Sequence, residues 1–159
     1  MVRGTWYELA FLVDPLSERQ ESLVLDHFDA VPRIFAGGCE LALAAEGPSV
    51  LAAVQGVVLD LDRQDIRVHR LVEDLVTRSA IAERAGVAPG TVDEWTREMR
   101  ERVGFPLPFT ASAGGLWLWG PVNRWLGTLA PDLSDGFTHP EISDHVEVNQ
   151  WLLSRAGML

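Results

Sequence analysis

The sequence predicts a mixed α+β fold, and three observations along the chain support this expectation. In residues 1–73, short segments with the two-residue alternation of strands are interspersed with segments of helical periodicity. Residues 74–130 carry the turn and cap signals of two consecutive helices, then a short hairpin pattern and one more helix. Residues 131–159 contain an amphipathic helical pattern. At 159 residues, of which 47% are hydrophobic, the chain can hold one ordinary domain or two small ones, and we expect domain boundaries at 73/74 and 130/131.

The first domain begins with a strand and a helix. Residues 6–13 are rich in strand-forming side chains and stop at Asp14-Pro15. A helix is expected after Ser17, because a hydroxyl followed by acidic and amide side chains is typical of a helix N-terminus. The apolar side chains expected on the buried face of this helix are Leu16, Leu23, Val24 and Phe28.

Two strands, a second helix and a last strand follow. Residues 33–36 and 39–45 flank Gly37-Gly38, a dipeptide that suits a tight hairpin turn. Residues 47–61 have a broad apolar face at helical spacing, and residues 66–72 alternate between apolar and polar side chains. The order strand, helix, strand, strand, helix, strand is that of the ferredoxin-like split βαβ arrangement, in which an antiparallel sheet carries two helices on one face.

The most informative pattern lies in residues 75–103 and predicts two helices joined by a tight turn. Ser79 can cap the first helix, and Gly86 can adopt the positive φ that ends it. Pro89-Gly90-Thr91 then opens a second helix. The apolar face of this second helix comprises Val92, Trp95, Met99 and Val103. The pattern is typical of a helix-turn-helix, and an ordinary packed helical hairpin is the alternative.

A small hairpin and a further helix are expected next. Pro106 and Pro108 favour an extended segment, and residues 109–111 and 116–119 can form the two arms of a hairpin with a tip rich in Ser and Gly. Pro121 falls in the first turn of the following helix. Helix, turn, helix, hairpin, helix is the layout of a winged helix-turn-helix.

The stretch from Asp74 to Leu126 resembles the excisionase and MerR type of winged helix-turn-helix domain. The segments that carry the resemblance are Ile81–Val87, Thr91–Trp95, Phe105–Pro108, Trp117–Trp119 and Val122–Leu126. The resemblance covers about a third of the chain. It implies a bacterial transcription regulator in which the second helix of the motif enters the major groove of DNA and the wing meets the flanking backbone.

Seven side chains are candidates for contacts with DNA. Arg97 and Arg100 lie on the outward face of the second helix, and arginine can contact phosphate or bond guanine in a bidentate manner. Hydroxyl and amide groups at the start of a helix can hold phosphates. The full candidate set is Thr77, Arg78, Ser79, Thr91, Arg97, Arg100 and Ser112. Simple capping by Ser79 and pairing of Glu94 with Arg97 are the structural alternatives.

The charge distribution favours a second hypothesis, an acidic protein-interaction module on a helix-turn-helix scaffold that does not bind DNA. The net charge is −10, and all 13 basic residues are arginine. Acidic residues outnumber arginine elsewhere in the chain, but residues 76–131 contain 6 Arg and 5 acidic residues. The Asp93-Glu94 pair lies in the first turn of the second helix, where base edges are usually contacted, and the wing tip lacks a basic side chain.

The sequence contains no recognisable set of catalytic residues and no cofactor-binding motif. No nucleophile elbow, GxGxxG or P-loop pattern is present, and the four histidines lack metal-site spacing. His145 with Asp144 and Glu141 can be interpreted as a weak metal site, but a solvated helix face is the favoured interpretation. Cys39, the only cysteine, is expected to be a buried strand residue. We therefore expect no enzyme activity, no metal and no cofactor.

The expected partner is double-stranded DNA. A homodimer would favour this interpretation, because one small domain contacts few base pairs, and a protein partner is the alternative. Four tryptophans, at positions 95, 117, 119 and 125, are expected to form the core of the winged domain, with an aromatic ligand cage as the alternative. The closing helix is expected to pack on the winged domain or on a second copy. The first residues show no signal-peptide pattern and no apolar run approaches about 18 residues, so we expect a cytoplasmic protein with no membrane segment.

Overall fold

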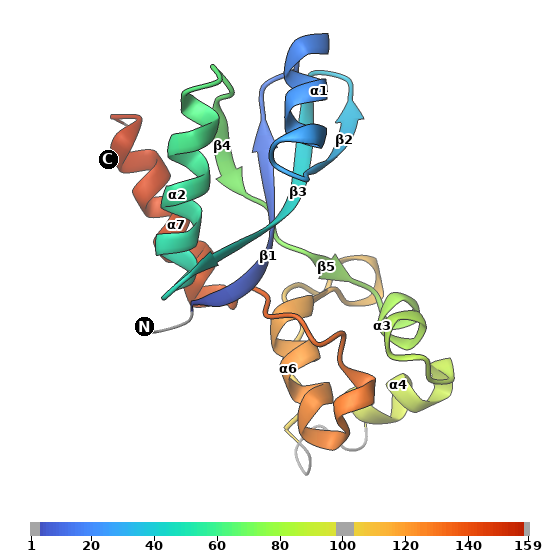
Figure 1. The fold of residues 1–159 in the computed structure, drawn as a ribbon. Helices are drawn as coiled ribbons and strands as arrows, with labels where there is room; N and C mark the ends of the chain where they lie inside the picture. Colours follow the sequence, from blue (N-terminus) through green and yellow to red (C-terminus); the bar gives the residue numbers. More distant parts are fainter. Residues whose placement is uncertain (1–3, 98–103, 158–159) are drawn as a thin grey trace. The chain divides into compact units, whose positions relative to one another are not determined.

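The computed structural model describes residues 4–97 and 104–157. The expected α+β class is confirmed: the described part of the chain contains a four-stranded antiparallel sheet, a two-stranded sheet and six α-helices (Figure 1). The chain divides into two compact units. The first comprises Met1–Glu73 with Ile142–Leu159, and the second comprises Asp74–Glu141.

Four strands form the sheet of the first unit, in the order β2-β3-β1-β4 (Figure 1). The strands are β1 (Thr5–Val13), β2 (Val31–Phe35), β3 (Gly38–Gly47) and β4 (Val68–Leu71). Each neighbouring pair is antiparallel. The central pair, β1 and β3, is in register from Thr5 opposite Gly47 to Val13 opposite Cys39. Consecutive strands β1 and β2 are therefore separated in the sheet by β3.

The alternation in the central strands buries one face of this sheet. In β1, Leu9, Phe11 and Val13 are buried, while the residues between them are more exposed. In β3 the buried side chains include Cys39, whose burial confirms the expectation from sequence. Burial raises the pKa of the Cys39 thiol, which keeps the side chain in its neutral, poorly nucleophilic form.

Helices α1 (Glu18–Asp26) and α2 (Val50–Asp62) contribute to the same core as these strand residues. Ser17 caps α1 in a capping box with Gln20, as its position before the apolar pattern predicts. Ser49 caps α2 through its hydroxyl, which accepts the Ala52 N–H at 3.1 Å. Hydroxyl caps therefore fix where both helices begin.

The last helix, α7 (Ile142–Arg155), packs on β4 and α2 of the first unit, not on residues 74–130 as one of the two expectations had it. Its buried residues are His145, Val148 and Leu152, at helical spacing. Asn149 adds a polar anchor, because its Oδ1 accepts the backbone N–H of Leu71 at 2.9 Å. An apolar stripe predicts that a helix needs a covering surface, but it does not identify that surface.

The second unit is built around two pairs of elements. Its helices are α3 (Arg78–Ala85), α4 (Pro89–Arg97) and α6 (Trp119–Leu129). The short strands β5 (Leu75–Val76) and β6 (Trp117–Leu118) pair antiparallel, with Val76 opposite Trp117. Residues 75 and 76 were expected to belong to the helical hairpin, and they form a strand instead because their partner lies in the distant β6.

Aromatic side chains dominate the core of the second unit. Trp95 and Trp125 meet edge to face with centroids 5.1 Å apart, and Phe105 lies 4.9 Å from Trp125. Trp117 and Trp119 are buried in the same cluster. The expectation that these four tryptophans form a core is thus confirmed.

A network of polar side chains fastens residues 131–141 to α6. The buried Asn123 donates from Nδ2 to Asp135 Oδ1 at 2.9 Å, and its Oδ1 accepts the Asp135 N–H at 2.9 Å. Asp135 Oδ2 also accepts from Trp119 Nε1 at 3.0 Å and lies 2.6 Å from His139 Nε2. Burial opposes ionisation of Asp135, but hydrogen bonds from Trp119, the Phe137 backbone and His139 outweigh it and hold the pKa of this carboxyl below its ordinary value.

Replacing Asp135 with alanine removes the acceptor of two largely buried donors. We expect Asp135→Ala to lower the free energy of unfolding of the second unit by about 1–3 kcal/mol at neutral pH. Because the folded-state pKa is lowered, this contribution is present above the unfolded-state pKa of about 3.9 and is lost as the pH falls through the folded value. Urea unfolding followed by tryptophan fluorescence measures it, with the exposed Asp132→Ala as control. Equal stability of Asp135→Ala and wild type at neutral pH would contradict the role of the network.

His145 gives the first unit a different acid sensitivity. The side chain is buried, and its Nδ1 has no hydrogen-bond partner in the described part of the chain. Desolvation lowers the pKa of His145, with a smaller lowering from Arg70. Glu73, the Leu71 backbone and Asp144 act in the opposite direction without reversing the shift.

We expect the first unit to lose stability as the pH falls from about 6.5, the ordinary histidine value, through the lowered folded-state pKa. The unfolded chain binds the proton more readily in this window, so protonation favours unfolding. His145→Gln should flatten the dependence, and His27→Gln, which changes an exposed histidine, should keep the wild-type slope. Urea midpoints by circular dichroism above and below about pH 6.5 test this, and the same slope in wild type and His145→Gln would refute it.

Candidate nucleic-acid interface

The candidate surface begins at the N-terminus of α3, where Thr77 rather than Ser79 is the cap. The Thr77 hydroxyl accepts the Ala80 N–H at 3.1 Å, and the residue is extended, with φ −81° and ψ 169°. Ser79 lies inside α3 and is exposed. The prediction that Ser79 caps the helix is therefore wrong, because β5 ends at Val76 and leaves Thr77 at the transition from strand to helix.

The turn between α3 and α4 is tight and depends on Gly86. This glycine has φ 70° and ψ 33°, the left-handed conformation expected for it from sequence. The N–H groups of both Gly86 and Val87 return to the Ala82 carbonyl, the latter at 3.0 Å, so the end of α3 is closed by backbone hydrogen bonds. Val92 and Trp95 are buried on one side of α4, so its other side faces solvent.

The candidate side chains differ in exposure. Thr77, Ser79, Arg97 and Ser112 are exposed, whereas Arg78 and Thr91 are half-buried. Arg100 lies outside the described residues.

Arg78 is held by three elements at once. As the first residue of α3, it places Nη1 3.6 Å from Oδ1 of Asp93 on α4. Its guanidinium carbon lies 5.7 Å from the ring centroid of Trp117 on β6. The buried Nε has no hydrogen-bond partner in the described part of the chain. The sequence identified Arg78 and Asp93 separately but gave no signal that they meet, since 15 positions separate them.

A second arginine serves the scaffold. Arg84 makes a bidentate ion pair with Asp74, at 2.7 and 3.1 Å, and its guanidinium carbon lies 4.9 Å from the Trp119 ring centroid. The Asp74 carbonyl also accepts the Trp119 N–H at 2.9 Å. Arg84 therefore joins α3 to the beginnings of β5 and α6.

The expected hairpin between residues 109–111 and 116–119 is reduced to a short turn, because Trp117 and Leu118 pair with β5 and Trp119 begins α6. Phe109 and Thr110 donate backbone N–H groups to the Leu116 carbonyl, at 2.6 and 3.3 Å, and Leu116 donates to the Thr110 carbonyl at 2.9 Å. Ser112 lies in the 3-10 turn at the tip, where Ala113 has a φ of 54°. Residues 109–116 contain no charged side chain, so this tip offers only hydroxyl and backbone groups to a ligand.

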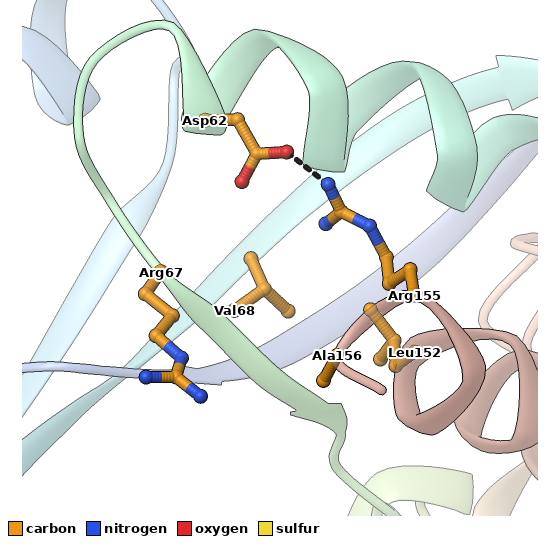
Figure 2. Close-up of a pocket in the computed structure, with 6 residues that line it drawn as sticks. All are labelled: Asp62, Arg67, Val68, Leu152, Arg155 and Ala156. Atoms are coloured by element: carbon orange, nitrogen blue, oxygen red, sulfur yellow. Dashed lines mark hydrogen bonds and ion pairs between the residues drawn. The ribbon is translucent and has the colours of Figure 1, made fainter. Parts of the chain in front are cut away.

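The first unit contains a polar hollow of about 260 Å³ near the end of α7 (Figure 2). Its lining residues are Asp62, Arg67, Val68, Leu152, Arg155 and Ala156. Arg155 is paired with Asp62, and Figure 2 shows the Arg67 guanidinium directed away from that pair. Arg155 also stacks over Trp151 at 5.2 Å, so its main contacts secure α7.

Comparison of the chain with protein-family models, curated proteins and solved structures gave no match. Across residues 4–97 and 104–157, no helix is long and apolar enough to cross a membrane. Within the same ranges, no three His, Cys, Asp or Glu side chains are grouped so that they could hold a metal ion.

The turn between α3 and α4 allows a test with two glycines. Gly86→Ala places a Cβ on a left-handed residue and should lower the free energy of unfolding by about 1–2 kcal/mol. Gly90→Ala, in the first turn of α4 and with open space around it, should instead raise it by about 0.4–1 kcal/mol. Urea unfolding of both variants provides the comparison, and a stabilised Gly86→Ala would rule out the left-handed turn.

Proposed function

We propose that the protein is a DNA-binding transcription regulator and that its second unit is a winged helix-turn-helix. The observation that carries the proposal is the geometry of α3, the left-handed Gly86 turn and α4. One side of α4 is buried through Val92 and Trp95, while Arg97 is exposed. A helix packed on one side and carrying arginine on the other suits the major groove of DNA, which is about 12 Å wide.

The segment after α4 supports the same assignment. The turn at residues 109–116 exposes Ser112 and adjacent small residues, whose hydroxyl and amide groups can donate to phosphate oxygens. In this proposal the turn is the wing and contacts the DNA backbone. Thr77, Arg78 and Ser79 contribute further backbone contacts from the start of α3, and Thr91 from the first turn of α4.

We further propose that the first unit is a ferredoxin-like domain that forms a homodimer. The antiparallel order β2-β3-β1-β4, with α1 and α2 in the intervening connections, supports the fold assignment. Trp6, Val31 and Phe35 are exposed and alternate with the residues that face the core, which supports a contact surface on the open side of the sheet. A dimer would bring two α4 helices to a two-part site.

An acidic protein-interaction module is the second candidate, and specific observations favour it. The net charge is −10, the wing tip has no basic side chain, and Asp93 partly neutralises Arg78. Each feature weakens attraction to phosphate. This candidate predicts that the folded protein has no affinity for duplex DNA even at low salt.

Selection of bound fragments from a random duplex pool, at low and moderate salt, distinguishes the two candidates. For an enriched duplex, we expect Arg97→Gln to weaken binding by about 1–3 kcal/mol if Arg97 contacts a base. Arg63→Gln makes the same charge change at an exposed position of the first unit and should leave the affinity near that of the wild type. No enrichment by the wild-type protein at low salt would refute DNA binding and leave the protein-interaction module.

A further inference from the structure

The position of Arg78 is electrostatically unusual. A cation at the first position of a helix opposes the helix dipole, which favours anions at that end. The first turn of α3 contains no acidic side chain to compensate. The compensating charge comes from another helix, through Asp93 on α4. The charge of Arg78 is thus unfavourable with respect to its own helix, and the carboxylate of Asp93 offsets it.

The contact between Arg78 and Asp93 is weak by its geometry. Their closest atoms are 3.6 Å apart, beyond the usual range of an N–H···O hydrogen bond. The side chains are 34% and 47% exposed, and partly exposed ion pairs of this kind contribute little to stability. Asp93 therefore balances the charge of Arg78 without consuming its hydrogen-bonding capacity in a bidentate contact.

Trp117 holds the guanidinium in place independently of Asp93. The ring lies 5.7 Å from the guanidinium carbon, and it is fixed by burial and by its own hydrogen bond from Nε1 to the Pro106 carbonyl at 3.1 Å. A guanidinium restrained on an aromatic ring loses little further freedom when it binds an anion. A phosphate can form shorter, bidentate, charge-assisted hydrogen bonds there.

We propose that Arg78 is a binding site for a backbone phosphate of DNA and that Asp93 is its internal competitor. This inference rests on the proposed DNA-binding function. In the free protein the Asp93 carboxylate occupies the neighbourhood that a phosphate takes in the complex. Binding exchanges one anion for the other, so Asp93 lowers the affinity for DNA of any sequence and limits non-specific binding.

The direct test is the affinity of Asp93→Asn for a random-sequence duplex, measured by fluorescence anisotropy at low salt. We expect binding about fivefold tighter than wild type and a steeper salt dependence, since one more phosphate contact is made without competition. Glu94→Gln is the matched control: it removes the same charge from the neighbouring, exposed position of α4. The increase in duplex affinity should be clearly smaller for Glu94→Gln than for Asp93→Asn. Asp93→Ser provides a second variant with the same expectation.

A double-mutant cycle connects the gain to Arg78. Arg78→Gln should weaken DNA binding. Adding Asp93→Asn to Arg78→Gln should raise the affinity for the duplex by no more than Glu94→Gln does in the wild type. Equal gains from Asp93→Asn and Glu94→Gln, or a full gain without Arg78, would overturn the inference while leaving DNA binding intact. If wild type, Asp93→Asn and Asp93→Ser all remain folded by tryptophan fluorescence and none binds duplex, the proposed function fails, and the inference fails with it.

Discussion

The indole rings of Trp95 and Trp125, 5.1 Å apart and flanked by Phe105, join α4 to α6 and to the segment that precedes the hairpin turn. Each aromatic side chain buries a large area, and a unit of this size has few other means of building a core. The direction in which α4 presents its exposed side is set by the burial of Trp95 on its other side. The candidate interface is in this sense the outer surface of the aromatic core.

Two arginines of this acidic chain, Arg84 and Arg78, differ in how they contact carboxylates and tryptophans. Arg84 combines a bidentate contact to Asp74 with stacking on Trp119, a combination that lysine cannot reproduce. Arg78 stacks in a similar way on Trp117 but has only a loose carboxylate partner. Arg84 therefore holds α3 against Asp74 and Trp119, whereas the Arg78 guanidinium makes no bidentate contact and its buried Nε has no hydrogen-bond partner in the described part of the chain. The net charge of −10 also disfavours non-specific attraction to phosphate.

The elements that local chemistry determines could be predicted from the sequence. Ser17 as a cap and Gly86 as a left-handed turn follow from side-chain type and position, and the strand alternation predicts which face is buried. Strand β5 could not be found in this way, because two residues are too few to show alternation and their partner lies in β6. The approach of Arg78 to Asp93 is equally non-local. Sequence spacing suggests pairs three or four residues apart on one helix, not pairs between helices.

Helix α7 completes the core of the first unit, but it follows the whole second unit in the sequence. The first unit therefore begins first and is completed last. Val148 and Leu152 become available to the first unit only after residues 74–141 have been synthesised. The second unit is one continuous segment and can assemble its aromatic core earlier, as domains do when they fold during synthesis. Until α7 arrives, β4 and α2 present uncovered apolar surface, and the Leu71 N–H lacks the Asn149 acceptor. The N-terminal half is therefore the part of the nascent chain whose core is completed last.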